Sequence, residues 1–427
     1  MAVQDPVQDP AQEPVQEQGL KRRALLAAGA LTLTALLSAL APAPRAHAQA
    51  QALPAPTGPY AVGTTTRHLV DTGREDPWKR GDREVMVSLF YPADESGDAP
   101  QMDSLSAAHF GSARGAAVFN YGVKAGAADW AATRTHARVD APVARGSRGL
   151  PVVLYSSGLG DPRTWNTGLV EELASRGYVV VTVDHTYDAS EVRLPGGRLA
   201  ESVLPALAGA PVEKVDETLR TAMGARVGDA RFVLDTLDDA KWRAGLPRGL
   251  GRSMDMGRVG MAGQSAGGFT AAQTTHDDRR VKAGVNMDGQ MDFPLPDASG
   301  RTLSSVAREG VGRPFLLLGS DGAGAADNRA SWTSFRQHAR GWRAEWKMAG
   351  AEHGSYTDAP SLLPALAGRG ALTAEQLGKD IGSVRPERAV AAERAYVVSF
   401  FDRFLKGHDD HLLDGPSARF PEMVREH

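Results

Sequence analysis

The sequence predicts an α/β fold with a mostly parallel central sheet flanked by helices. Two continuous apolar runs, 151–155 and 178–183, indicate buried parallel strands, and the helix expected between them completes a strand–helix–strand crossover. A third apolar run, 259–262, leads directly into Gly263-Gln264-Ser265-Ala266-Gly267-Gly268 and a helix-forming stretch. With 427 residues and 42% hydrophobic content, the chain can bury one large core.

The remaining elements follow from local patterns along the chain. Alternation over 84–91 predicts an early antiparallel strand ended by Pro92, and a polar insertion over 94–148 contains a weak helix signal near 127–138. Residues 186–212 have the composition of a loop. Helical spacing over 215–240 and 388–406 predicts two amphipathic helices, and the other strands are expected at 281–287, 314–319 and 344–348. One α/β domain over 58–427, with insertions framing the pocket, accounts for all of these segments.

The N-terminus has the pattern of a bacterial export signal. A polar, proline-rich extension is followed by Lys21-Arg22-Arg23, an apolar stretch to Leu40 and the small-residue cleavage signal Ala46-His47-Ala48. The paired arginines resemble a twin-arginine signal, so we expect residues 1–48 to be removed and the protein to be secreted, with 49–57 as a linker. The alternative is a membrane anchor, but prolines interrupt the apolar run, which is short for a span.

Composition limits the chemistry. The chain has no cysteine, which excludes disulfides, thiolate metal sites and a cysteine nucleophile. The formal net charge of −3 supplies no basic surface, so we expect no nucleic-acid partner. No glycine-rich phosphate loop has suitable flanks, and we expect no cofactor. Catalysis would therefore rest on serine, histidine and carboxylates.

The glycine-flanked serine predicts a nucleophile elbow. In such a turn the serine lies on a tight bend between strand and helix, and the glycines two residues either side let the backbone crowd together. Ser265 is therefore the candidate nucleophile. The alternative is a glycine-rich turn with an idle serine, which the flanking strand and helix patterns disfavour.

A serine hydroxyl needs a base, and the base needs a carboxylate to orient it. His353 lies in a loop five residues after the last of the expected parallel strands, which fits the chain order serine, acid, histidine of α/β-hydrolases. Two aspartates at strand ends compete for the acid: Asp288 follows 281–287, and Asp321 follows 314–320. Spacing alone does not choose between them.

An oxyanion hole needs two backbone N–H groups directed at the oxygen that becomes negative during acyl transfer. The first is expected from Ala266, the residue after the nucleophile. The second is expected from the loop Ser157-Gly158-Leu159-Gly160 after an early strand, with the Leu159 amide as the donor.

A resemblance to a known family covers roughly residues 58 to 410, with gaps, and is carried by Ser88-Leu89-Phe90-Tyr91-Pro92-Ala93, Tyr155 to Gly160, Leu173 to Tyr178, Val183-Asp184-His185, the elbow, Met287-Asp288 and Phe293-Pro294-Leu295. In these segments the chain resembles the platelet-activating factor acetylhydrolase family of α/β-hydrolases, which includes bacterial esterase and lipase members. The resemblance implies Ser265 as nucleophile, Asp288 as acid and His353 as base, with Leu159 and Ala266 at the oxyanion hole.

Two departures from the family pattern concern the pocket. Ser157 stands where the family usually has histidine, and the segments 94–148 and 186–212 do not resemble the family's phospholipase closely. The catalytic residues therefore carry over better than the substrate does.

Other polar and aromatic residues have competing interpretations. His185 could line the pocket or hydrogen-bond within the sheet rim, and we expect the latter. His408-Asp409-Asp410-His411 has ligand types at metal-like spacing, but a solvated tail explains it better, and we expect no metal. Trp130, Trp165 and Trp332 could contact an acyl chain, although core packing is the usual role.

These observations predict a secreted, metal-independent serine ester hydrolase acting on short-acyl or phospholipid esters through an acyl-enzyme. Its partners would be small-molecule or lipid esters, with at most transient contact with a lipid surface. A lipase or polyester hydrolase acting on long or polymeric esters is the alternative within hydrolases. A non-catalytic α/β-hydrolase-like binding protein is the alternative from another class.

Overall fold

The computed structural model describes residues 53–426, apart from 117–119 and 323–324. The export signal expected over 1–48, and residues 49–52 of the expected linker, lie outside the described residues. Within the described part of the chain, none of the helices has both the length and the apolar character needed to cross a membrane.

A ten-stranded sheet runs through the molecule in the order β12-β11-β10-β9-β8-β4-β5-β2-β1-β3. Strands β4, β5, β8, β9, β10 and β11 pair in parallel, while β2 is antiparallel to both β1 and β5. The bounds are β1 (Ala61–Glu75), β2 (Asp82–Ala93), β3 (Ala137–Val139), β4 (Leu150–Ser156), β5 (Val179–Asp184), β8 (Met254–Gln264), β9 (Val281–Met287), β10 (Phe315–Ser320), β11 (Arg343–Met348) and β12 (Met423–Arg425), with a separate hairpin of β6 (Glu191–Leu194) and β7 (Arg198–Glu201).

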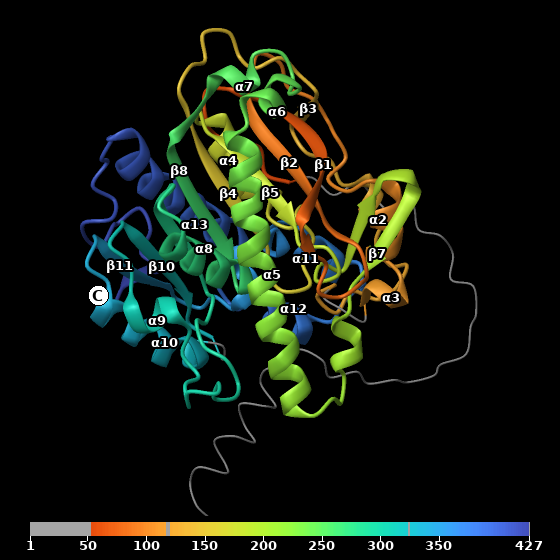
Figure 1. Cartoon of the computed structure of the whole chain (residues 1–427), viewed down its shortest axis with the longest axis vertical. Helices are drawn as coiled ribbons and strands as arrows, with labels where there is room; N and C mark the ends of the chain where they lie inside the picture. The colour runs from red at the N-terminus through yellow and green to blue at the C-terminus, as the bar shows by residue number, and fades with distance from the viewer. Residues whose placement is uncertain (1–52, 117–119, 323–324, 427) are drawn as a thin grey trace, which may run out of the picture.

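Helices cover both faces of the sheet (Figure 1). The α-helices are α2 (Ser104–Phe110), α3 (Ala113–Ala116), α4 (Thr167–Ser175), α5 (Val212–Asp238), α6 (Ala240–Ala244), α7 (Leu250–Ser253), α8 (Ala266–Asp277), α9 (Ser305–Glu309), α10 (Ala325–His338), α11 (Ala359–Gly368), α12 (Ala374–Ile381) and α13 (Pro386–Phe401), with short helical turns at Trp130–Ala132, Pro195–Gly197, Leu204–Leu207, His353–Tyr356 and Asp402–Lys406. This arrangement confirms the predicted α/β-hydrolase fold.

Strand β4 explains why its sequence is apolar throughout. Successive side chains of a strand point to opposite faces, so Val153 and Tyr155 pack with α4 and α13, while Val152 and Leu154 pack with α5 and α8. Because both faces are covered, the strand cannot alternate between apolar and polar residues as a one-sided strand would. The central parallel strands are consequently held from both sides, which fixes the positions of the loops at their carboxyl ends.

Several local predictions differ from the structure. The weak helix expected near 127–138 is wrong: the segment holds one helical turn and the short strand β3, because Thr133 and Thr135 form backbone hydrogen bonds with Gln101 and Ala99. The segment 186–212, expected to be a loop, contains the hairpin β6–β7, and the local sequence patterns predict neither β1 nor β12. The strand expected at 84–91 continues past Pro92 to Ala93, and the last helix gives way at residue 402 to a π-helical turn.

The described part of the expected linker, residues 53–57, is docked against the domain. The Leu53 side chain is 2% exposed, and the Arg394 guanidinium donates hydrogen bonds to the carbonyl oxygens of Pro54 (2.8 Å) and Ala55 (3.0 Å). The Thr57 amide and hydroxyl both donate to the Glu172 carboxylate at 2.7 Å. These residues are thus part of the folded domain, since their polar groups are satisfied by helices α4 and α13.

Candidate active site

Ser265 lies on a strained turn between β8 and α8, with φ 56° and ψ −124°. Only glycine fits two positions before and two positions after Ser265, because a Cβ at Gly267 would collide with the Ser156 carbonyl oxygen and one at Gly263 would collide with Gly267. The Ser265 amide is held by the Met287 carbonyl at 2.8 Å. A non-glycine residue in such a conformation costs free energy and is retained where the surrounding structure over-determines it, as at active sites.

Two residues from other strand ends form a histidine–carboxylate pair beside this turn. Asp288 directly follows β9, and His353 opens the helical turn after β11. The His353 Nδ1 and Asp288 Oδ2 atoms are 2.7 Å apart. The Asp288 carboxylate, 2% exposed, also accepts hydrogen bonds from the Ser320 amide and hydroxyl (2.9 Å each) and from Asn328 Nδ2 (3.0 Å).

These contacts determine the charge states of the pair. Burial raises the pKa of Asp288, but the His353 and Ser320 hydrogen bonds outweigh it and hold the pKa below its ordinary value. Desolvation lowers the pKa of His353, and the hydrogen bond and charge of Asp288 more than reverse this, so its pKa is raised. An ionised Asp288 keeps the proton of neutral His353 on Nδ1, which leaves Nε2 free to accept another.

The competing acid, Asp321, does not reach the histidine. Its side chain is exposed at the end of β10, and its carboxylate accepts a long hydrogen bond of 3.5 Å from the Gly350 amide. The carboxylate beside His353 is that of Asp288. The Ser265 hydroxyl makes no hydrogen bond to another described residue, which is common in free enzymes, where catalytic hydrogen bonds tighten on substrate binding.

The loop Ser157–Gly160 follows β4, the neighbour of β8 in the sheet. Ser156 pairs with Gly263, so this loop starts beside the elbow. The Leu159 and Ala266 side chains pack against one hydrophobic cluster. In the described part of the chain the Leu159 amide donates no hydrogen bond, and the Ala266 amide belongs to the first turn of α8, where helix N–H groups lack intrahelical partners.

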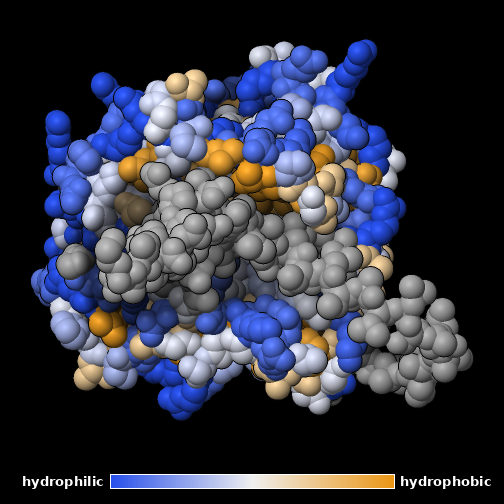
Figure 2. Space-filling model, turned by 90° about the horizontal axis from the view of Figure 1, so that it is seen from below, coloured by the Kyte–Doolittle hydropathy of each residue, from blue (hydrophilic) through white to orange (hydrophobic). Residues whose placement is uncertain are grey.

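Apolar side chains surround this part of the molecule. Phe293 packs edge-on against Phe269 of α8, with ring centroids 5.7 Å apart, and the Arg220 guanidinium of α5 lies 4.2 Å from the centre of the Phe293 ring. Strand β8 runs toward the lower side of the molecule in Figure 1, and Figure 2, the view from below, shows a band of hydrophobic residues with hydrophilic residues along its outer side. Next to the elbow, therefore, two aromatic rings and one guanidinium lie together, and Phe269 is tied to Ser265 through its backbone amide.

Comparisons with known proteins agree with one another. A family model described as platelet-activating factor acetylhydrolase, isoform II, matches residues 45–193. A probable 1-alkyl-2-acetylglycerophosphocholine esterase of Arthroderma benhamiae is 27% identical over 390 residues, which are 87% of this chain and 93% of that protein. A platelet-activating factor acetylhydrolase of Cavia porcellus is 25% identical over 185 residues, or 39% of this chain and 40% of that protein. These matches confirm the resemblance of the chain to the platelet-activating factor acetylhydrolase family.

A solved structure supports the same fold. The ferulic acid esterase of Streptomyces cinnamoneus matches with a TM-score of 0.71 and 35% identity, covering 89% of this chain and 100% of that one. The family model ends at residue 193, so it includes the Leu159 loop and stops before Ser265, while the matches over 87% and 89% of the chain extend beyond it. The family-model match, the curated relatives and the solved neighbour together place the chain among the esterases of the α/β-hydrolase fold.

Two residues beside the site were missed by sequence reasoning. Gln264 Nε2 donates to the His353 carbonyl oxygen at 3.1 Å and so ties the elbow to the histidine loop. Asp161 is buried just after the Leu159 loop, and the Tyr121 hydroxyl lies 3.3 Å from both of its carboxylate oxygens. Burial raises the pKa of Asp161 to about 7 against the opposing charge of His353. The position of Asp161 directly after a glycine-containing loop was the one signal for it in the sequence.

The remaining candidate residues, which are His185, three tryptophans and the polar group near the C-terminus, make contacts that support the fold or lie at the surface. His185 is 1% exposed and hydrogen-bonded within the fold, as expected. Trp130 and Trp165 pack with Phe110, and Trp332 Nε1 donates to the Gly289 carbonyl at 2.8 Å. In the expected tail, ligand atoms of Asp409, His411 and Asp414 lie within 4.8 Å of one another at the surface, an arrangement common without any ion.

Proposed function

We propose that the protein is a secreted serine esterase in which Ser265, His353 and Asp288 act as nucleophile, base and orienting acid. The observation that carries this proposal is the 2.7 Å hydrogen bond between His353 and the buried Asp288, next to a serine held in a strained elbow. The residue types alone would not distinguish a catalytic group from ordinary polar contacts. Three features together favour a catalytic role: the strained backbone at Ser265, the hydrogen bond that orients His353, and the ionised, buried carboxylate of Asp288.

The proposed reaction follows from these positions. His353 Nε2 takes the proton of the Ser265 hydroxyl as its oxygen attacks the ester carbonyl. The Leu159 and Ala266 amides donate to the resulting oxyanion, and the tetrahedral intermediate expels the alcohol, which receives the proton from His353. Water, activated by the same histidine, then releases the acyl group from Ser265. Asp288 remains ionised and stabilises the imidazolium throughout.

For the substrate, we propose short-acyl esters, including the acetyl ester of a glycerophospholipid. The Arthroderma relative is named for such an ester, and it aligns over 93% of its own length. An aromatic acyl ester is a second candidate, because the Streptomyces protein named as a ferulic acid esterase is more similar, at 35% identity over 89% of this chain. Phe293 and Phe269 beside the elbow would suit an aromatic acyl group. Long or polymeric esters are a third outcome of the same assay.

Export is proposed from the N-terminal pattern. If residues 1–48 are a cleaved signal, mass spectrometry of protein from the culture medium should find a chain beginning near Gln49. Recovery of Met1 in a membrane fraction would instead identify an anchor.

The catalytic proposal is tested with a fluorophosphonate probe and a substrate panel. The probe should label Ser265 in the wild type and leave Ser265→Ala unlabelled; an unlabelled wild type would favour a non-catalytic binding protein. The panel comprises p-nitrophenyl acetate, longer p-nitrophenyl esters, an acetyl glycerophospholipid and methyl ferulate. The highest kcat/KM on the acetyl phospholipid supports the first candidate, and the highest on methyl ferulate supports the second.

A further inference from the structure

One buried guanidinium holds the loop that contains Leu159. Arg226 lies in the middle of α5 and is 0% exposed. Its Nη1 donates to the Ser157 carbonyl at 2.7 Å, and its Nη2 donates to the Gly158 carbonyl at 2.8 Å. Two consecutive carbonyls of one loop are therefore held by a residue of α5 that lies 69 and 68 positions further along the chain.

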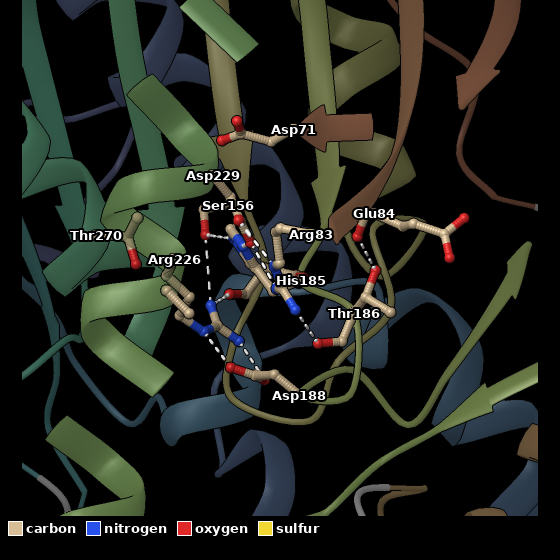
Figure 3. Close-up of polar contacts among 12 residues, drawn as sticks. Asp71, Arg83, Glu84, Ser156, His185, Thr186, Asp188, Arg226, Asp229 and Thr270 are labelled. Atoms are coloured by element: carbon tan, nitrogen blue, oxygen red, sulfur yellow. Dashed lines mark hydrogen bonds and ion pairs between the residues drawn. The ribbon is translucent and has the colours of Figure 1, made fainter. Parts of the chain in front are cut away.

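An ion pair fixes Arg226 in turn, as Figure 3 shows. The Asp188 carboxylate accepts from Arg226 Nε at 2.6 Å and from Nη2 at 2.7 Å, in the bidentate geometry that orients a guanidinium plane. Asp188 Oδ1 also accepts from the Gly160 amide at 3.1 Å. One arginine–aspartate pair thus binds the loop on both sides of Leu159.

The direction of the Leu159 amide follows from peptide geometry. The described chain has no cis peptide bonds, so the Gly158–Leu159 peptide is trans, and its C=O and N–H point in opposite directions. With the Gly158 carbonyl held by Arg226, the Leu159 N–H must point away from α5. Rotation of this peptide would break a charge-assisted hydrogen bond in a buried site, which is costly.

A second set of contacts stabilises the other side of the guanidinium. Ser156 Oγ lies 3.4 Å from Arg226 Nη1 and 2.8 Å from His185 Nε2, and His185 Nδ1 lies 3.0 Å from Asp229. Ser156, His185 and Asp229 are each at most 1% exposed, so this serine–histidine–aspartate series has no access to substrate. Because this series contacts Arg226, we interpret it as a structural support for the Leu159 loop.

We propose that Arg226, held by Asp188, is a positioning residue that sets the Leu159 amide as an oxyanion donor. The inference rests on the proposed function of the Ser265 site. It assigns a role in transition-state stabilisation to a residue that never contacts substrate. A lysine at this position keeps the charge but cannot hold two carbonyls and a bidentate carboxylate together.

The test compares Arg226→Lys with Arg394→Lys. Arg394 is a matched control, because it is also buried and donates to two consecutive carbonyls, those of Pro54 and Ala55, away from the site. For Arg226→Lys we expect kcat on p-nitrophenyl acetate to fall about 100-fold, the scale of losing one oxyanion donor, with KM changed less than about threefold. Arg394→Lys should lower the melting temperature and leave kcat within about twofold.

A trifluoromethyl ketone supplies a second measurement. It adds the serine oxygen to its carbonyl and leaves a negative oxygen in the oxyanion hole, so its inhibition constant should weaken in Arg226→Lys by a factor similar to the loss in kcat. A kcat within threefold of wild type, a loss confined to KM, or an unchanged inhibition constant would overturn the proposal.

Two further variants separate the possible failures. If Arg226→Lys does not fold, Asp188→Asn should still lower kcat about 3- to 10-fold in the same assays. The reason is that the uncharged amide weakens the bidentate contact with Nε and Nη2 that orients the guanidinium. An unchanged kcat in that variant contradicts the inference. Ser265→Ala tests the underlying function separately. If Ser265→Ala is inactive and Arg226→Lys is fully active, the positioning role alone is wrong, whereas an active Ser265→Ala overturns the proposed site.

Discussion

The described part of the chain contains two serine–histidine–aspartate arrangements, and they differ in the backbone at the serine and in the exposure of the histidine. Ser265 lies in a strained elbow, and its candidate base His353 is 49% exposed. Ser156 closes the regular strand β4, and its partner His185 is 1% exposed. Burial and the nearby Arg226 lower the pKa of His185, whereas Asp288 raises the pKa of His353 over the effect of desolvation.

The comparison shows that residue types and hydrogen bonds do not by themselves make a catalytic triad. Neutral His185 donates to ionised Asp229 and accepts from the Ser156 hydroxyl, so all its hydrogen-bonding capacity is used inside the fold. His353 has one ring nitrogen bound to Asp288 and an exposed edge. The candidate active site therefore differs from the buried Ser156–His185–Asp229 group in two ways. The His353 side chain is exposed, and its Nε2 atom remains available to accept a proton.

The largest expected effect tests this distinction directly. Ser265→Ala should lower kcat on p-nitrophenyl acetate by about 10⁴-fold or more, because the nucleophile is removed. Ser156→Ala should change kcat less than about fivefold and destabilise the fold by about 1–3 kcal/mol, because His185 Nε2 loses its partner in a buried site. The measurements are steady-state kinetics and thermal unfolding. Equal losses of kcat in the two variants would contradict the comparison.

A second pair of variants separates the two candidate acids. Asp288→Asn should reduce kcat by about 10³- to 10⁴-fold, because the amide no longer fixes the histidine tautomer or stabilises its charged form. Asp321→Asn should stay within about twofold of wild type, since its carboxylate is exposed and, among the described residues, accepts one long hydrogen bond, from the Gly350 amide. Kinetics at saturating ester decide the matter, and the reverse order of effects would move the acid to Asp321.

Asp229 should affect stability rather than chemistry. Its carboxylate pairs with Arg83 and Arg74 and holds His185, so Asp229→Asn leaves buried positive charge uncompensated and should cost about 3–5 kcal/mol. Despite burial, Arg83 and His185 lower the pKa of Asp229, so its contribution to stability is full above the unfolded value of about 3.9 and is lost as pH falls below it. Denaturant unfolding of wild type and variant at pH 7, and again at about pH 2 to 3, below the unfolded value, measures both effects. A variant as stable as wild type at pH 7 would refute this role.

The smallest effect concerns pH. His353 must be neutral to accept a proton, so its raised pKa places the acid limb of kcat/KM above the ordinary value of about 6.5. Removing the Asp288 charge destabilises the imidazolium, and the acid limb of residual Asp288→Asn activity should shift to lower pH. Profiles of kcat/KM between pH 5 and 9 measure the shift. An unmoved limb would mean that another group controls it.

Local patterns in the sequence predicted much of the candidate site. The continuous apolar runs predict the buried parallel strands, and the glycines two residues either side of Ser265 predict the elbow from local sequence. His353 followed from its place after the last of these strands. The prediction of a helix near 127–138 is wrong, because tertiary hydrogen bonds to residues 99 and 101 hold that segment in a non-helical conformation. Spacing also left Asp288 and Asp321 undecided, and only the resemblance to a family favoured Asp288.

By itself the sequence determined the fold class, the strained turn at Ser265 and the order of the catalytic candidates, because these depend on hydrophobic periodicity and on glycines that are read locally. The tertiary structure decided which aspartate meets His353, that Ser156, His185 and Asp229 form a buried support, and that Arg226 holds the Leu159 loop. These contacts join residues between 29 and 70 positions apart, and no local pattern specifies which side chains the sheet order will bring together.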